Sequence, residues 1–561
     1  MNRIVALLIA VALVSPASAQ RTQPQPQQPR LVENIDVRII DFDVVVTDRR
    51  GNFVSGLSKD DFEILENGVP KPISNFAEID AGAPKRILAT EVSGEVVEQN
   101  PAQAPAAMQE EMKRRIIIYI DNLSLAPFNR NRVFKQMKEF LHSAMRPGDE
   151  AMVATYNRSM KVRAPFTRDP NQISSILDAI STESGLGVAN RSERKSFEER
   201  IREATSYQDA IASARTYASS VEHDLRQSAS SLSALMQTLA GVDGKKILVL
   251  TSEGFPIQPG REIFQFVDEI AREKNWQATS SSLEAMHYDG TNLIQSIAKT
   301  ANANDITLYT IHAAGLAANT EMSAENARPV SSMVTHALTT NTTESMHMMA
   351  QMTGGLASVN TNNFEAAFKR IQSDLDSYYS LGYRAGTERV DRQRYLQVRL
   401  KNRKDLQVRA RQTFVEKSVQ AEMGDRVVAN LLYRAKDNDL GILARAGTPY
   451  PVEGGLFRVT VDIQIPMLSL TLLPQGDTEH VGGFDVYVVV GNKDNDMSDV
   501  AQKQHQVRVP NERMKELGGK FYTYTLDLLV ERGLNKISLG VVDQISNTTG
   551  FTREQIIAQN Q

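Results

Sequence analysis

Two expected strands end in polar side chains that could bind a ligand. Residues 116–120 are apolar and mostly β-branched, and they are followed by Asp121 and, three residues later, by the hydroxyl of Ser124. Residues 247–251 form a similar run, after which Glu253 is the first carboxylate. Such runs are typical of strands buried on both faces of a parallel sheet, and open α/β sheets bind ligands at the carboxyl ends of their strands. We therefore expect Asp121, Ser124 and Glu253 to lie at one functional edge.

The sequence has no recognisable constellation for enzymatic chemistry. It lacks a Gly-x-Ser-x-Gly elbow and a His-Glu-x-x-His zinc helix, and the segment 241–245 is too short for a phosphate loop. With no cysteine, it also has no thiolate metal site and no cysteine nucleophile. His312 ends another expected strand and could be a ligand or a base, but such a histidine is more often a satisfied edge residue. We therefore predict a protein that is not an enzyme.

Composition and the N-terminal residues indicate an exported protein. Lys and Arg total 63 against 67 Asp and Glu, so no global charge points to nucleic acid. Residues 1–19 have a basic start, an apolar core and an Ala-Ser-Ala ending, which is the pattern of a secretory signal peptide. No other segment is long and apolar enough to span a bilayer. We expect cleavage before Gln20, a periplasmic or secreted location, and a disordered Pro/Gln tether over residues 20–32.

The central part of the chain predicts a doubly wound α/β domain. Between residues 113 and 378, apolar strand-like runs alternate with amphipathic helix patterns and show no repeat period. This order predicts a mostly parallel sheet of about six strands covered by helices. A polar, charge-mixed stretch over residues 183–227 is expected to be a helical insertion on the surface. We interpret its charge run at 191–202 as a solvated helix face rather than a docking site.

Segments that alternate with period two flank this domain on both sides. Residues 33–80 predict a small β-module, and residues 81–112 are expected to be a linker with a strand near residues 86–89. Residues 379–415 are expected to complete the small module, because neither set alone has enough strands for a two-sheet core. Residues 422–561 predict a β-sandwich resembling immunoglobulin-like folds, without the disulfide and the strand-spaced tryptophan of true members.

Several blocks of this sequence resemble one bacterial family. They are residues 116–124, the Arg-Pro-Gly-Asp run at 146–149, the segment 244–254 with its Ser-Glu-Gly ending, the Tyr-Tyr-Ser-Leu-Gly-Tyr run at 378–383, the upstream block 44–76 and the Val-Arg-Ala-Arg run at 408–411. In this order they resemble bacterial proteins that contain a von Willebrand factor A-related domain. The resemblance covers roughly residues 35–415. It implies a von Willebrand A-type sheet that binds protein partners.

The resemblance also implies a divalent cation at the carboxyl edge of the sheet. In that family an Asp-x-Ser-x-Ser run, a distant Thr and a later Asp hold the metal, and an acidic group of a protein partner completes its coordination. Asp121 fits the first position and Glu253 stands where the later Asp is expected. Leu123 and Leu125 stand where the family has its two serines, with Ser124 as the nearby hydroxyl. Asp121, Ser124 and Glu253 would therefore be the ligands for Mg²⁺ or Ca²⁺ in a degenerate site.

Two further expectations concern the neighbours of this site. Thr182 is the candidate for the distant threonine. The alternative to a metal site is an edge without metal, in which Asp121 caps a helix or pairs with Arg130 or Arg132.

We therefore predict an exported, non-enzymatic protein-binding protein, an adhesion or scaffold protein with a degenerate metal-ion-dependent adhesion site. Its protein partners, whose identity the sequence does not reveal, would contact the carboxyl edge of the sheet. The alternative is a structural or assembly module that acts through its β-domains without metal-dependent binding. A hydrolase would require a Ser, a His and a carboxylate that converge in a pocket.

Overall fold

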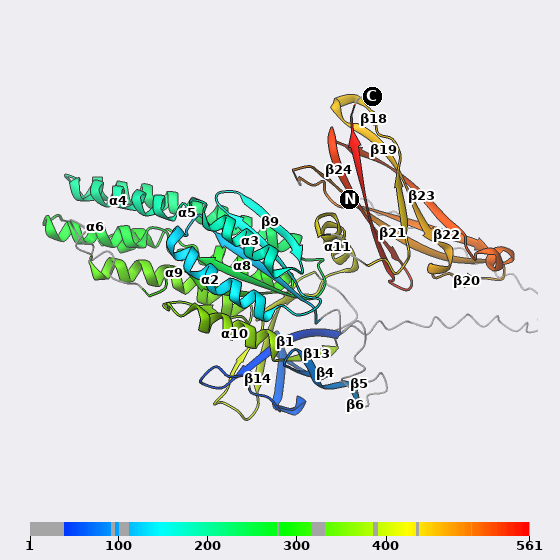
Figure 1. Ribbon diagram of the computed structural model, residues 1–561, viewed down its shortest axis with the longest axis horizontal. Helices are drawn as coiled ribbons and strands as arrows, with labels where there is room; N and C mark the ends of the chain where they lie inside the picture. The colour runs from blue at the N-terminus through cyan, green and yellow to red at the C-terminus, as the bar shows by residue number, and fades with distance from the viewer. Residues whose placement is uncertain are drawn as a thin grey trace, which may run out of the picture.

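The computed structural model describes residues 39–90, 96–99, 112–277, 280–316, 331–384, 391–433, 437–494 and 496–559. The expected signal peptide over residues 1–19 and the tether over residues 20–32 lie outside the described residues. Figure 1 shows a central body of helices and strands, with further groups of strands below it and to its upper right. Among the described residues, no helix combines the length and the hydrophobicity needed to cross a bilayer.

A six-stranded sheet forms the centre of the α/β body. Its order is β12-β11-β10-β7-β8-β9, and its ladders are parallel except that β9 runs antiparallel to β8. The strands are β7 (Arg114–Asp121), β8 (Glu150–Tyr156), β9 (Met160–Thr167), β10 (Lys245–Ser252), β11 (Ile306–His312) and β12 (Ala357–Ser358). The expected α/β architecture with a mainly parallel sheet is therefore confirmed.

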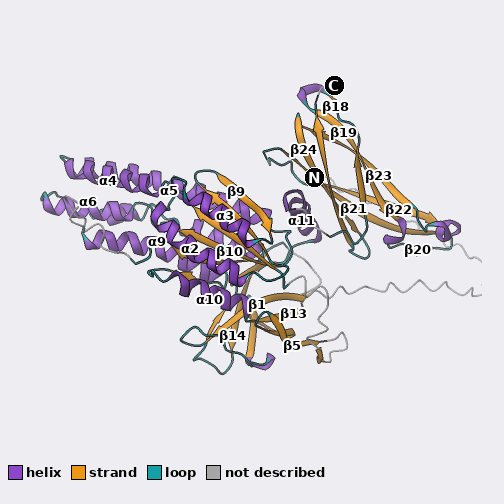
Figure 2. Cartoon of the chain, viewed as in Figure 1, coloured by secondary structure: helices purple, strands orange, loops and turns teal. Residues whose placement is uncertain are grey.

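Alternate residues of β7 pack against opposite layers of helices. Ile116, Ile118 and Ile120 belong to a cluster with α2 (Pro127–Ala144), α3 (Pro170–Ser181) and α10 (Phe364–Asp376). Ile117 and Tyr119 belong to a second cluster with the C-terminal part of α5 (Tyr207–Thr238), α8 (Thr291–Ala303) and the end of α9 (Ser332–Met352). Figure 2 shows these helices gathered around the central strands. A parallel sheet needs helices on both of its faces. Because both faces of β7 are buried in this way, its residues are apolar without alternation.

A helical extension projects from the α/β body, toward the left of Figure 1. It consists of α4 (Gly187–Glu203), the N-terminal part of α5, α6 (Arg261–Glu273) and the short α7 (Ser282–Ala285). Apolar side chains of these helices, such as Phe197, Ile211 and Phe264, form a cluster of their own. The helical insertion expected over residues 183–227 differs from this arrangement, because α5 runs through its far boundary to Thr238. The helical extension is thus continuous with a helix that covers the sheet.

Strands from both ends of the α/β domain form two more sheets. Their orders are β15-β1-β13-β4-β5-β6 and β16-β14-β2-β3. The strands are β1 (Ile39–Thr47), β2 (Phe62–Glu66), β3 (Val69–Lys71), β4 (Ile73–Asp80), β5 (Ala83–Thr90), β6 (Val96–Gln99), β13 (Tyr378–Arg384), β14 (Gln393–Leu400), β15 (Gln407–Arg409) and β16 (Thr413–Val415). β13 follows the α/β domain in sequence, yet it lies between β1 and β4, which precede it. A shared apolar cluster joins side chains of the two sheets.

The segment 81–112, which the sequence predicts to be a linker with a strand near residues 86–89, contains more β-structure than that prediction. It contains β5 and β6, and β5 continues the sheet by pairing with β4. Ala81 and Gly82 both have positive φ angles, which is the backbone of a tight hairpin turn between β4 and β5. Pro84, Lys85 and Arg86 interrupt the apolar pattern of β5, so its alternation is weak in the sequence.

The C-terminal part combines one helix with two antiparallel sheets. Helix α11 (Val419–Tyr433) packs against β21 and β24 through an apolar cluster. The strands are β17 (Leu443–Ala446), β18 (Tyr450–Pro451), β19 (Phe457–Pro466), β20 (Leu473–Gln475), β21 (Glu479–Asn492), β22 (Ala501–Pro510), β23 (Phe521–Val530), β24 (Gly533–Asp543) and β25 (Thr549–Ala558). β19 pairs with β17, β18 and β23, and β21 pairs with β20, β22 and β24. One apolar cluster fills the space between the two sheets.

Candidate functional site

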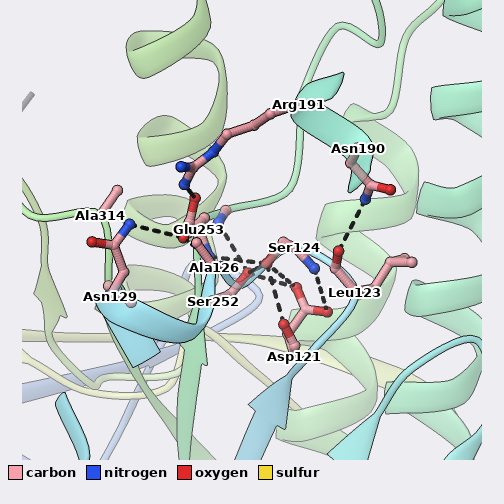
Figure 3. A network of polar contacts seen from close by, with 12 residues as sticks. Asp121, Leu123, Ser124, Ala126, Asn129, Asn190, Arg191, Ser252, Glu253 and Ala314 are labelled. Carbon is pink, nitrogen blue, oxygen red and sulfur yellow. Dashed lines mark hydrogen bonds and ion pairs between the residues drawn. The ribbon is translucent and has the colours of Figure 1, made fainter. Parts of the chain in front are cut away.

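The ends of β7 and β10 bring the predicted polar residues together (Figure 3). The Ser124 hydroxyl donates to Asp121 Oδ2 at 2.6 Å, and the Ser252 hydroxyl donates to the same oxygen at 2.7 Å. The two serine oxygens are 3.0 Å apart. Because β7 and β10 are parallel neighbours, their last residues lie at the same edge. The structure thus places Asp121, Ser124 and Ser252 in one buried cluster, which we call the edge cluster.

Leu123 and Leu125, the two leucines that flank Ser124, belong to the hydrophobic core. Leu123 packs in the cluster on one face of the sheet, and Leu125 packs in the cluster on the other. The amides of Ser124 and Leu125 both donate to the Asp121 carbonyl, at 3.2 and 3.1 Å, so the chain turns sharply as it leaves β7. This turn directs both leucine side chains into apolar surroundings. Their positions therefore serve packing, and they contribute no ligand oxygen.

Glu253 lies beside this cluster and caps the start of helix α2. Its Oε1 accepts from the Ala126 amide at 2.8 Å and from Asn129 Nδ2 at 3.0 Å. Ala126 is the N-cap residue of α2 and has no side-chain oxygen that could accept from the first-turn amides. A carboxylate near the positive end of a helix dipole is stabilising. Glu253 thus supplies from β10 the negative charge that α2 itself lacks.

Arg191, a residue of the helical extension, forms an ion pair with the other carboxylate oxygen of Glu253. Figure 3 shows its guanidinium directed at Glu253 from the neighbouring helix α4. The side chain is 47% exposed, whereas that of Glu253 is 13% exposed. The interpretation of residues 191–202 as a solvated helix face misses this contact. Arg191 is 62 residues from Glu253 in the chain, and no local sequence signal links the two.

The start of α4 is held tightly against the turn after β7. The Leu186 amide donates to the Asn122 carbonyl at 2.9 Å, and Asn190 Nδ2 donates to the Leu123 carbonyl at 2.9 Å. A Cβ atom at Gly187 would lie 2.3 Å from the Ser124 carbonyl oxygen, which is closer than atoms can approach. Only glycine therefore allows α4 to approach this closely, and the approach positions Arg191.

Burial sets the protonation of two groups at this edge. The absence of solvent raises the pKa of Asp121, although hydrogen bonds from Ser124 and Ser252 act in the opposite direction. Burial also lowers the pKa of His312, and the negative charge of Glu253 partly opposes that effect. His312 Nδ1 has no hydrogen-bond partner among the described residues. A neutral imidazole is therefore favoured at the end of β11.

The arrangement does not fit a divalent cation. Asp121 is buried with two serine hydroxyls on one oxygen, and both oxygens of Glu253 already accept hydrogen bonds or an ion pair. The Thr182 hydroxyl donates to the Ala179 carbonyl at the end of α3. Among the described residues, no group of three or more His, Asp or Glu side chains converges in a way that could hold a metal. The implied Mg²⁺ or Ca²⁺ ligation by Asp121, Ser124 and Glu253 is therefore not supported by the geometry.

Arg130 and Arg132, the partners expected for Asp121 at an edge without metal, contact other groups in the structure. Arg130 donates to Asn122 Oδ1 and to the carbonyls of Ser181 and Glu183. Arg132 donates to the carbonyls of Ala313 and Ala314 and to the side chains of Asn129 and Asn362. The prediction that Asp121 pairs with Arg130 or Arg132 is therefore wrong. Both arginines instead tie α2 to neighbouring loops.

Comparisons with known proteins give weak similarities. No protein-family model matches the chain, and no curated protein matches it. Among solved structures, a von Willebrand factor type A protein from Catenulispora acidiphila is 10% identical, with 90% of this chain and 75% of that chain covered and a TM-score of 0.22. BatB from Bacteroides thetaiotaomicron is 8% identical, with 47% and 96% covered and a TM-score of 0.21.

A third similar structure is the manganese-loaded TRAP protein of Plasmodium vivax. It is 10% identical, with 55% of this chain and 94% of that chain covered and a TM-score of 0.22. Similarities at these scores carry no argument about fold or activity. The architecture rests instead on the strand order and the ladders of the central sheet.

Proposed function

We propose that this chain is an exported, non-enzymatic protein-binding protein, of the adhesion or scaffold kind, and that partners bind at the carboxyl edge of the central sheet. In this proposal the charge at the edge is that of the Arg191–Glu253 pair, and no metal takes part. The signal-peptide pattern of residues 1–19 supports the export.

The single observation that carries the proposal is the half-exposed side chain of Arg191, whose guanidinium is paired with Glu253. Glu253 occupies one side of it, and a planar guanidinium with five N–H donors can bond a second acceptor at the same time. A carboxylate or a backbone carbonyl of a partner would be such an acceptor. Arginine is also enriched at protein interfaces and is common among the residues that dominate binding energy.

The segments that meet at Glu253 also expose apolar side chains. Phe128 precedes Asn129 on α2 and is 74% exposed, and Val188 lies one helical turn before Arg191 on α4 and is also exposed. Exposed apolar groups around a charged group are typical of protein-binding surfaces. These residues support a partner that combines an acceptor group with apolar contacts.

The chemistry of the edge cluster supports a role without catalysis. Both serine hydroxyl protons are donated to Asp121, and the serine oxygens accept from the amides of Glu253 and Gly254. A nucleophilic serine needs a base that accepts its proton, with the oxygen free to attack. A buried carboxylate that holds two hydroxyls acts as a structural acceptor instead.

Affinity capture from a cell-envelope extract of the source organism tests this proposal. The wild-type chain, Arg191→Ala and Glu253→Gln are used as bait, with Arg226→Ala as the matched control. Arg226 is also exposed and ion-paired, but to Glu222 within α5. We expect a partner that binds the wild type and the control and is lost with both edge variants. A partner retained by Arg191→Ala would contradict the proposal.

A second candidate function is a structural or assembly module that acts through its β-domains. The C-terminal sheets favour it, because exposed large apolar side chains are frequent there, including Leu443, Leu468, Leu473 and Ile557. Self-association of the full chain, together with no partner captured by the wild-type bait, would favour this second function, since an assembly module needs only its β-domains. Sedimentation velocity of the full chain measures it.

A further inference from the structure

β23 is an open edge of its sheet. It pairs over its whole length with β19, in an antiparallel register that runs from Phe457 opposite Val530 to Pro466 opposite Phe521. Among the described residues no strand pairs with its other side, and no ladder joins it to β22, which precedes it in the chain. Over the ten residues of β23, the N–H and C=O groups of every second residue therefore point to this edge without a strand partner.

The composition of β23 does not protect it against pairing with another strand. Natural edge strands are usually blocked by lysines, inward-pointing charges, prolines or bulges. β22, the open edge of the facing sheet, carries Lys503, Arg508 and Pro510. β23 has the sequence Phe-Tyr-Thr-Tyr-Thr-Leu-Asp-Leu-Leu-Val, with Asp527 as its one charged residue. An unprotected apolar edge of this length indicates an edge that is covered in the working protein.

We propose that β23 pairs antiparallel with β23 of a second copy of this chain, about a two-fold axis that passes beside Thr525. The four strands of this sheet and their copies would then form one continuous sheet across two molecules. An interface about a two-fold axis must be self-complementary, so each side chain has to suit the residue that it meets in the copy.

The outward-facing side chains of β23 meet this requirement in one register. With the axis at Thr525, Phe521 lies opposite Leu529 of the copy, and Leu529 lies opposite Phe521. Both side chains are exposed in the single chain, at 48% and 56%. Thr523 lies opposite Asp527, so a hydroxyl meets a carboxylate. The inward-facing set pairs Tyr522 with Leu528. Directly opposed aromatic and aliphatic side chains stabilise antiparallel pairs.

Neighbouring registers that keep both faces of the sheet are worse. With the axis at Asp527, two carboxylates lie directly opposite each other, which is destabilising. With the axis at Tyr524, Phe521 lies opposite Asp527. With the axis at Thr523, Leu529 has no opposite residue within β23, because its partner position would be residue 517. With the axis at Leu526, Phe521 would lie opposite Glu531, which is outside β23. The register at Thr525 is therefore the one that covers both exposed apolar side chains and separates the charges.

This inference concerns a surface remote in sequence from Arg191 and goes beyond the proposed function of the α/β edge. It also identifies a second copy of the chain as the partner that covers the exposed apolar side chains of β23. Each of the two proposals can fail without the other, because one needs a partner protein at α4 and the other needs only a second copy.

Cysteine cross-linking of the full chain tests the pairing and its register. The chain has no cysteine, so each introduced thiol is unique. Thr525→Cys places the two thiols beside the axis, within the Cα separation of roughly 4.4–6.8 Å that a disulfide needs. Thr523→Cys is the matched control on the same strand and face, because its two copies would lie about 14 Å apart, four residues of strand rise.

We expect the wild type to sediment as a dimer and Thr525→Cys to form a covalent dimer under mild oxidation. Thr523→Cys alone should stay uncross-linked, and a mixture of Thr523→Cys with Asp527→Cys should form the mixed covalent dimer. A monomeric wild type at the highest soluble concentration would overturn the proposal. So would a dimer in which Thr525→Cys fails to cross-link, or one in which Thr523→Cys cross-links equally well.

Discussion

Replacement of Asp121 by alanine should destabilise the α/β domain by an amount that follows from the edge cluster. Both serine hydroxyls donate to one carboxylate oxygen, and both serine oxygens already accept from backbone amides. The Ser124 and Ser252 oxygens are 3.0 Å apart. Without the carboxylate, one hydroxyl can donate to the other, which uses only one of the two protons. One donor is then left with at best the weak 3.4 Å contact from the Ser124 hydroxyl to the main-chain carbonyl of residue 121, at a cost of about 1–3 kcal/mol.

Asp121→Asn is the matched variant. Its amide oxygen can take the place of Oδ2 and accept from both hydroxyls, so the two short bonds persist. Its amide nitrogen then faces the Ser124 amide, which is a weak contact at 3.4 Å in the wild type. We expect Asp121→Asn to cost less than about 1 kcal/mol, since no short hydrogen bond is lost.

Urea unfolding followed by the fluorescence of Trp276 measures both variants. Trp276 is the only tryptophan of the chain, and it packs against the apolar cluster of the helical extension, so it reports on the α/β domain. Equal destabilisation by the alanine and asparagine variants would refute this reasoning, because it would mean that the hydroxyl protons are not held by Asp121.

The pH dependence of stability, compared between the wild type and Asp121→Asn, tests the role of Asp121 in a second way. Burial raises the pKa of Asp121 in the folded state above its unfolded value of roughly 3.9. The folded protein therefore binds the Asp121 proton more tightly than the unfolded chain does, and this proton stabilises the fold. The stabilisation is full below the unfolded pKa of Asp121 and is lost as pH rises through its folded pKa. Asp121→Asn has no such loss. The free energy of unfolding of Asp121→Asn, relative to that of the wild type, should therefore increase with pH. A difference between the two that does not change with pH would contradict the raised pKa of Asp121.

Three further predictions concern metal binding, the packing of α4 and an ion pair at the opposite end of β7. Calorimetric titration with Mg²⁺, Mn²⁺ and Ca²⁺ should give no binding heat, because the oxygens of Glu253 are already engaged; heat that disappears in Asp121→Ala would show that a metal site exists. Gly187→Ala should destabilise the domain by about 1–3 kcal/mol in the Trp276 assay, because overpacking typically costs that much. An unchanged unfolding midpoint would mean that α4 has room to move. Arg114→Met should cost about 3–5 kcal/mol, because it leaves the Asp149 carboxylate buried without its ion-pair partner, and a loss below about 1 kcal/mol would count against that pair.

The central sheet could be predicted from the sequence because its signals are local. β7 and β10 are continuous apolar runs that end in polar residues, and a parallel sheet brings such ends to the same edge. The proximity of Asp121, Ser124 and Glu253 follows from that geometry alone. The strand β5 could be predicted only in part, as a strand near residues 86–89, because Pro84 and two basic residues interrupt its pattern and its pairing with β4 is not visible in the sequence.

The contact between Arg191 and Glu253 could not be predicted for a different reason. A charged residue in a polar helix carries the same local pattern whether it meets solvent or a carboxylate 62 residues away. The glycines at 185 and 187 are the one trace of this contact in the sequence. Their missing Cβ atoms let α4 approach the carbonyls of Ser124 and Leu125, but a glycine alone does not indicate which backbone it approaches.

The leucines after Asp121 and the arginine of α4 have one physical explanation. A metal site at this edge needs ligand oxygens whose charge is balanced by the cation. Once Leu123 and Leu125 are committed to the two cores, Asp121 and Glu253 remain near each other with no cation to balance them. Burial then raises the pKa of Asp121, and Arg191 supplies a positive charge for Glu253. The helical extension thus supplies, through Arg191, the positive charge that a cation would otherwise supply at this edge.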